Sequence, residues 1–197
     1  MPPITTRDEA FALLCEWVTS ESLRRHCLAV EAAMVHYARK GGHDEASWAI
    51  AGLLHDADYE RYPDLDDSEH GHPRTIVALL TGNGTDREIV DAIAGHAPFL
   101  GVPRDTEMAR TLFAVDELSG FVVACCAVRP GGIDGLTAKS VRKKLKSPAF
   151  AAAVSRDDIA LGAEELGVDL NEHITEVIAA LDARGDELGL HPAGPEG

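Results

Sequence analysis

An adjacent histidine and aspartate, His55-Asp56, follow an apolar run and are the most chemically suggestive pair in the sequence. The run, residues 46–54, is apolar almost all round and predicts a buried helix near residues 44–56. An anion is unfavourable at the C-terminal end of such a helix, because the helix dipole is negative there and the surroundings are apolar. A bound cation would relieve both penalties, and His55 could supply a neutral imidazole ligand. Adjacent helical residues diverge by about 100°, so spacing alone does not show that both bind one ion.

Four further side chains have the types and positions expected of metal ligands. His26 and Asp116 each lie in the apolar stripe of a different predicted helix, so both should point into the core. His72 comes just before a predicted helix, and His96 lies near the end of another. Imidazole and carboxylate ligands drawn from facing helices are typical of a transition-metal centre inside a bundle. Such a site suits Fe, Mn, Co, Ni or Zn better than Ca.

Each of these residues also has an ordinary structural interpretation. A single histidine such as His26 is commonly a satisfied core residue, and Asp116 could bond to backbone groups. His70 competes with His72 as the ligand from the loop. We choose His72 because Pro73 constrains the chain directly after it.

The elements that position these residues are predicted to be helices throughout. Apolar residues recur three or four apart, and no segment alternates convincingly with the period of a strand, which favours an all-α helical bundle. Gly41 and Gly82 are typical helix ends, and Pro73 is a typical first residue. We predict helices near residues 7–18, 21–40, 44–56, 73–81, 87–97, 105–128, 139–146, 156–166 and 170–187.

A single domain is expected over residues 1–188. Its metal-site core would occupy about residues 20–130, and its C-terminal helices about residues 137–188. The Pro- and Gly-rich residues 189–197 are predicted to form a flexible tail.

Composition narrows the classes of partner and the location. The net charge of -15 opposes binding to nucleic acid polymers and to anionic membranes. No stretch approaches about 18 apolar residues, and the N-terminus has no apolar leader segment. The four cysteines form no C-x-x-C pair and suit a reducing compartment. We therefore expect a cytoplasmic protein without a membrane or nucleic acid partner, and a homo-oligomer is left open.

The order His26, His55-Asp56, Asp116 on a helical pattern resembles the His-Asp (HD) superfamily of metal-dependent phosphohydrolases. Residues 53–60, Leu-Leu-His-Asp-Ala-Asp-Tyr-Glu, are similar to its signature segment. The resemblance covers roughly residues 20–130, and a weaker similarity continues through residues 143–146 and 155–157. The common signature reads His-Asp-Ile-Gly where this chain has His-Asp-Ala-Asp, which puts close kinship with that subgroup in doubt.

The resemblance implies an HD-type bundle in which His26, His55, Asp56 and Asp116 bind one metal ion. Two-metal members of the superfamily have two more histidines between the His-Asp pair and the last aspartate, and Asp56 then bridges the ions. His72 and His96 match that order. In one-metal members, histidines at these positions can instead face the substrate phosphate, so one or two divalent ions are both compatible with the sequence.

The activity implied is hydrolysis of a phosphate ester of a small metabolite or nucleotide by a metal-activated water. Asp58 and Glu60 follow the ligands in the same predicted loop and could transfer protons, or they could be solvated acids. A basic run could neutralise the phosphates of a small phosphorylated substrate, or it could be a solvated helix face; it comprises Arg142, Lys143, Lys144 and Lys146.

Two other functions are compatible with the same residues. A minority of the superfamily uses the six-ligand pattern as a di-iron oxygenase, and His72 and His96 keep that alternative open. A non-catalytic regulatory module on the HD scaffold is the third possibility. The presence of all four core ligands argues against it.

Overall fold

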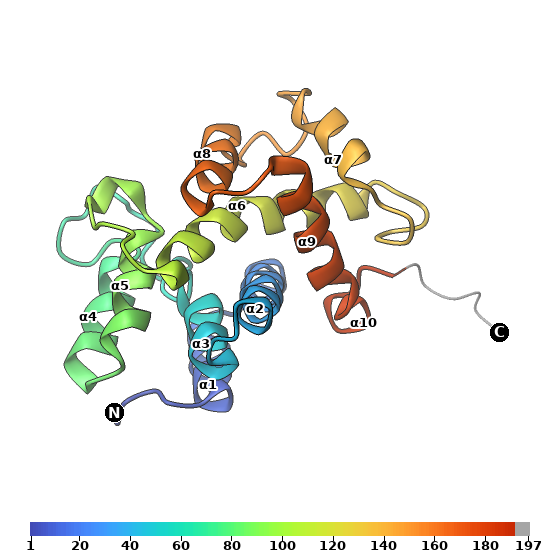
Figure 1. Cartoon of the computed structure of the whole chain (residues 1–197). Coiled ribbons are helices and arrows are strands. Elements are labelled where there is room, and N and C mark those ends of the chain that lie inside the picture. The colour runs from blue at the N-terminus through green and yellow to red at the C-terminus, as the bar shows by residue number, and fades with distance from the viewer. Residues whose placement is uncertain (192–197) are drawn as a thin grey trace.

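A computed structural model describes residues 1–191, and this part of the chain is all-α, as predicted (Figure 1). It contains ten α-helices, one short 3-10 helix and no strand. The helices are α1 (Arg7–Trp17), α2 (Glu21–Gly41), α3 (Glu45–Leu54), α4 (Arg74–Asn83), α5 (Arg87–Gly95), η1 (Pro98–Leu100), α6 (Glu107–Ala127), α7 (Ala138–Leu145), α8 (Arg156–Leu166), α9 (Leu170–Asp182) and α10 (Gly185–Leu188).

Two 21-residue helices, α2 and α6, pack against each other and carry much of the core. Helices α4 and α5 lie together near the N-terminal end of α6, and α7 lies near its C-terminal end (Figure 1). Helix α8 packs along α6, while α9 contacts both α2 and α6. The C-terminal helices therefore cover the two long helices and do not form a separate core.

Helix α3 is the buried helix that the sequence predicts. Every residue from Trp48 to Leu54 is buried, and α3 packs against α1, α2 and α5. Its contact with α2 is unusually close at Gly52, where an added Cβ would lie 2.7 Å from the Cα of Glu31. The absence of a side chain at this position lets the two backbones approach each other.

Several predicted boundaries need correction. The predicted helix near residues 44–56 ends at Leu54, so Asp56 lies in the following turn. Gly82 lies inside α4, and the helix ends instead at Gly84, whose φ of 80° is easy only for glycine. The predicted helix near residues 170–187 is two helices, because the backbone leaves the helical region at Arg184.

The predicted flexible tail begins too early. Leu190 is buried, its N–H donates to the carbonyl of Gly185, and its carbonyl accepts from the N–H of Ile133. These contacts attach residues 189–191 to the fold. The rest of the predicted tail, residues 192–197, lies outside the described residues. Across the described part of the chain, no helix is both long enough and apolar enough to cross a bilayer.

Candidate metal centre

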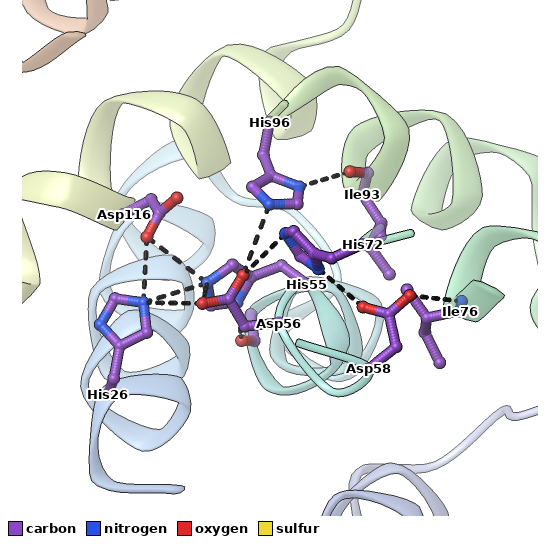
Figure 2. A network of polar contacts seen from close by, with 10 residues as sticks. His26, His55, Asp56, Asp58, His72, Ile76, Ile93, His96 and Asp116 are labelled. Atoms are coloured by element: carbon purple, nitrogen blue, oxygen red, sulfur yellow. Dashed lines mark hydrogen bonds and ion pairs between the residues drawn. The ribbon is translucent and has the colours of Figure 1, made fainter. Parts of the chain in front are cut away.

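The six predicted ligands converge from five segments of the chain (Figure 2). His26 lies on α2, and Asp116 lies in the middle of α6. His55 and His96 are the residues that directly follow α3 and α5, and both keep helical backbone angles. Asp56 and His72 come from the turns before and after the acidic loop. Because α3 ends before Asp56, this side chain is free to face the same region as His55.

Four donor atoms form the first half of the centre. The Nε2 atoms of His26 and His55 lie 3.2 Å apart, and each is 3.6 Å from Oδ2 of Asp56. Oδ1 of Asp116 lies 3.0 Å from the His26 nitrogen and 3.4 Å from the His55 nitrogen. Two imidazoles and two carboxylates therefore point at one small volume.

The second half shares Asp56 with the first. Its other oxygen, Oδ1, lies 3.2 Å from Nε2 of His72 and 3.6 Å from Nε2 of His96. Figure 2 shows Asp56 between the two sets of side chains. One carboxylate thus directs one oxygen to each set, which is the arrangement expected of a ligand that bridges two ions.

Three of the four histidines are oriented by a hydrogen bond at the opposite ring nitrogen. Nδ1 of His55 donates to the carbonyl of Gly52 at 2.8 Å, and Nδ1 of His96 donates to the carbonyl of Ile93. Nδ1 of His72 donates to Oδ1 of Asp58 at 2.7 Å. With the proton on Nδ1, the lone pair of Nε2 is directed at the centre, as a metal ligand requires.

The electrostatics of the cluster favour a cation. Although burial opposes a charge on His55, Asp56 and Asp116 raise the pKa of this imidazole to about 9. Burial likewise opposes ionisation of the two carboxyls, but the surrounding histidines hold the pKa of both below the usual range. The same negative field that attracts a proton attracts a metal ion.

The donor set therefore fits one or two divalent ions. His26, His55 and Asp56 form one group of converging ligand atoms, which Asp116 extends, and Asp56, His72 and His96 form the other. The nitrogen-rich mixture with two carboxylates suits a transition metal better than Ca²⁺.

The contacts of Asp58 and Glu60 do not support the proton-transfer role predicted for them. Asp58 is fully buried, and its oxygens accept hydrogen bonds from His72 and from the N–H of Ile76 at 2.9 Å. Its carboxylate thus orients the candidate ligand His72. Glu60 accepts from the backbone N–H groups of Thr19 and Ser20, both at 2.9 Å, and from the Thr19 hydroxyl. These hydrogen bonds hold the Glu60 carboxylate at the start of α2.

The basic run lies on α7 and the residue after it, away from the ligands. Arg142, Lys143 and Lys146 line a surface pocket of about 720 Å³ that includes Asn171 of α9, and no ligand residue lines this pocket. Lys144 packs over the ring of Phe150. The structure therefore does not join these cations to the metal centre, and their predicted contact with the substrate phosphate is without geometric support.

One neighbour of the centre, Tyr59, was not predicted from the sequence. The ring of Tyr59 packs edge-on against His72, with the ring centroids 5.1 Å apart, yet 43% of the residue is exposed. An aromatic residue in a polar loop carries no periodic signal. Its position directly after Asp58 is the only hint in the sequence.

The fold and the site thus define the class of protein: an all-α bundle with a candidate metal centre built from histidines and aspartates. Residues 23–120 match the family model described as HD domain, and this range contains all six ligands. Residues 23–120 therefore form an HD domain, the domain shared by the His-Asp superfamily. No curated protein and no solved structure gives a significant match.

Proposed function

We propose that this protein is a metal-dependent phosphohydrolase that acts on a phosphate ester of a small metabolite or nucleotide. The observation that carries the proposal is the division of Asp56, with one oxygen facing His26 and His55 and the other facing His72 and His96. A divalent metal held by these residues supplies a Lewis acid for a phosphoryl oxygen and lowers the pKa of a bound water.

The charge of the ligand set suits a phosphate dianion best when two ions are bound. The six ligands carry two negative charges, from Asp56 and Asp116, because neutral imidazoles are the binding form. Two divalent ions leave the centre with two positive charges, whereas a single ion leaves it neutral. Balancing a dianionic phosphate within a partly buried site therefore favours two ions.

The chain's own residues contribute orientation. The bonds from His55, His72 and His96 to Gly52, Asp58 and Ile93 hold the rings in place before any ligand binds. Such preorganisation reduces the reorganisation needed when charge develops on the phosphoryl group. The more exposed edge of the centre is formed by His26, Asp56 and Asp116, so a substrate would approach from that side.

The test combines metal analysis with activity. Protein purified without chelator is expected to contain up to two transition-metal ions per chain and to release phosphate from some member of a broad ester panel. His55→Ala should abolish release, and His72→Ala should reduce the metal content from two ions to one. His70→Ala is the matched control, because this exposed histidine lies beside Asp67 in the loop and its imidazole is not among the converging donor atoms. No release with Mn, Co, Ni, Fe or Zn across the panel would refute the proposal.

A di-iron oxygenase is the second candidate, and the pair His72 and His96 beside Asp56 is the observation that supports it. It predicts two iron ions per chain and oxygen consumption on addition of substrate. Oxygen-independent turnover would eliminate it. The intact ligand set gives no support to a non-catalytic module.

A further inference from the structure

A pocket beside the metal centre is the feature from which more can be inferred. Its volume is about 470 Å³, and it lies between the start of α2 and the loop after α3. Of the pockets described for residues 1–191, it is the one that includes a metal ligand. Its lining residues are Ser20, Ser22, Leu23, His26, Tyr59, Glu60 and Pro63.

The pocket borders residues from both halves of the centre. His26, a ligand of the first half, forms part of its wall. Tyr59, another lining residue, packs against His72 of the second half. A group attached to a phosphate at the centre would therefore lie beside Tyr59 and the neighbouring wall.

The walls are largely apolar. Leu23, Tyr59 and Pro63 contribute hydrophobic surface, while Ser20 and Ser22 contribute hydroxyls that already bond to each other at 2.9 Å. Tyr59 is exposed although it is large and aromatic. An exposed aromatic ring at the mouth of a polar centre is typical of a surface that binds an organic group.

Charge distinguishes among the groups that could bind there. None of the pocket's lining residues is a lysine or an arginine, and Glu60 adds a carboxylate. Thr19 and Ser20 donate three hydrogen bonds to Glu60, which fill most of the acceptor positions of its carboxylate. A second phosphate or a carboxylate would meet no lysine or arginine in the pocket lining and would be repelled by Glu60.

We propose that Leu23 and Tyr59 bind the organic part of the substrate, and that this part is an uncharged, partly apolar group. The substrate class is then a phosphate monoester of such an alcohol, in preference to a polyphosphate or an ester with a second acid group. This inference rests on the proposed function, because it takes the phosphate to bind at the metal centre.

Binding of phosphonates to the metal-loaded protein tests the inference without relying on turnover. Calorimetric titration under anaerobic conditions would compare methylphosphonate, phenylphosphonate and phosphonoacetate, with inorganic phosphate as the reference. We expect phenylphosphonate to bind about tenfold more tightly than methylphosphonate, a difference equivalent to about 1.4 kcal/mol. Phosphonoacetate should bind no more tightly than methylphosphonate, since its carboxylate finds no cation.

Two variants test which residues cause the preference for phenylphosphonate. Leu23→Ala and Tyr59→Ala should each reduce the advantage of phenylphosphonate to less than about threefold, because each removes part of the apolar wall. Leu23→Ala is needed beside Tyr59→Ala because Tyr59 also packs against His72. Tyr62→Ala is the matched control: it is a partly exposed tyrosine of the same loop, it does not line the pocket, and its loss should leave the preference intact.

The outcomes separate this inference from the proposed function. Suppose that inorganic phosphate binds in a metal-dependent manner. If phenylphosphonate then binds no more tightly than methylphosphonate, or if both variants keep the preference for phenylphosphonate, the inference fails and the proposed function stands. Tighter binding of phosphonoacetate than of phenylphosphonate would also overturn the inference. If neither phosphate nor any phosphonate binds with any of the metals, the proposed function and the inference fail together.

Discussion

At the scale of single residues, the orientation of histidine rings determines whether a cluster can bind metal. Asp58 illustrates this, because its carboxylate accepts from Nδ1 of His72 with one oxygen and from the N–H of Ile76 with the other. It therefore connects a ligand to the start of α4. A carboxylate behind a ligating histidine fixes the ring and raises its basicity.

Asp58→Asn should weaken the half of the centre that contains His72. An asparagine side chain offers one oxygen and one NH₂ group, so one of the two N–H donors loses its acceptor. We expect the affinity for the second metal ion to fall by about 10–100-fold, with the first ion retained. Metal titration followed by elemental analysis measures this. Glu60→Gln is the control and should leave both affinities unchanged, and equal effects of the two variants would contradict the role of Asp58.

At the scale of helices, the distance between α2 and α3 positions His26 relative to His55. The two helices approach each other closely at Gly52, three residues before His55. A side chain at this position meets the backbone of Glu31, which cannot move aside as a flexible side chain can. The spacing of the first-half ligands thus depends on a glycine that binds no metal.

Gly52→Ala should separate the two helices and disturb the centre. The added methyl group would lie 2.7 Å from the Cα of Glu31, so we expect a loss of about 1–3 kcal/mol in the free energy of unfolding. The affinity for metal should fall as well. Gly82→Ala is the matched control, because Gly82 is an exposed residue of α4 with open space around it. This substitution should stabilise the protein by about 0.5–1 kcal/mol. Urea unfolding and metal titration would check both variants, and unchanged metal binding in Gly52→Ala would refute the argument.

At the scale of the whole molecule, two buried polar connections hold the C-terminal helices on the long helices. In the first, Nε2 of His173 on α9 donates to the carbonyl of Ala114 on α6 at 2.9 Å, and Nδ1 accepts from the Tyr37 hydroxyl on α2 at 2.7 Å. In the second, the buried carboxylate of Glu31 on α2 pairs with Arg7 of α1 and with Arg184 before α10.

The first connection predicts a dependence of stability on pH. Burial lowers the pKa of His173, so the unfolded chain binds a proton more readily than the folded chain. Stability from this residue is therefore fully present above the unfolded pKa of about 6.5 and is lost as the pH falls below it. The difference in unfolding free energy between wild type and His173→Gln should shrink below that pH. A difference that is constant from pH 8 to pH 5.5 would contradict the assignment.

The second connection predicts non-additive effects. Either arginine alone can still neutralise Glu31, whereas removal of both leaves a buried carboxylate without a partner. Arg7→Ala and Arg184→Ala together should therefore cost about 1–2 kcal/mol more than the sum of the two single variants. Chemical unfolding of the wild type, the two single variants and the double variant would measure the four free energies that this double-mutant comparison needs. An additive result would show that the two arginines act independently.

The sequence by itself predicted most of the helices and the six side chains that the structure brings together. Apolar periodicity and capping residues are local signals. Helix α8, which follows its capping residue Ser155, therefore begins and ends at the predicted residues. The position of His55-Asp56 after an apolar helix indicated a cation for a local electrostatic reason. The boundaries that were wrong, at Gly84 and Arg184, depend on which of several plausible residues leaves the helical region.

Only the tertiary structure decided how the ligands divide and which neighbours support them. The two oxygens of Asp56 face different sets of histidines, and this depends on distances among segments that are far apart in the chain. For the same reason, the sequence does not reveal that Asp58 contacts His72 or that the basic run lines a pocket without a predicted ligand. Residue type and spacing show what a side chain can do, but packing determines what it faces.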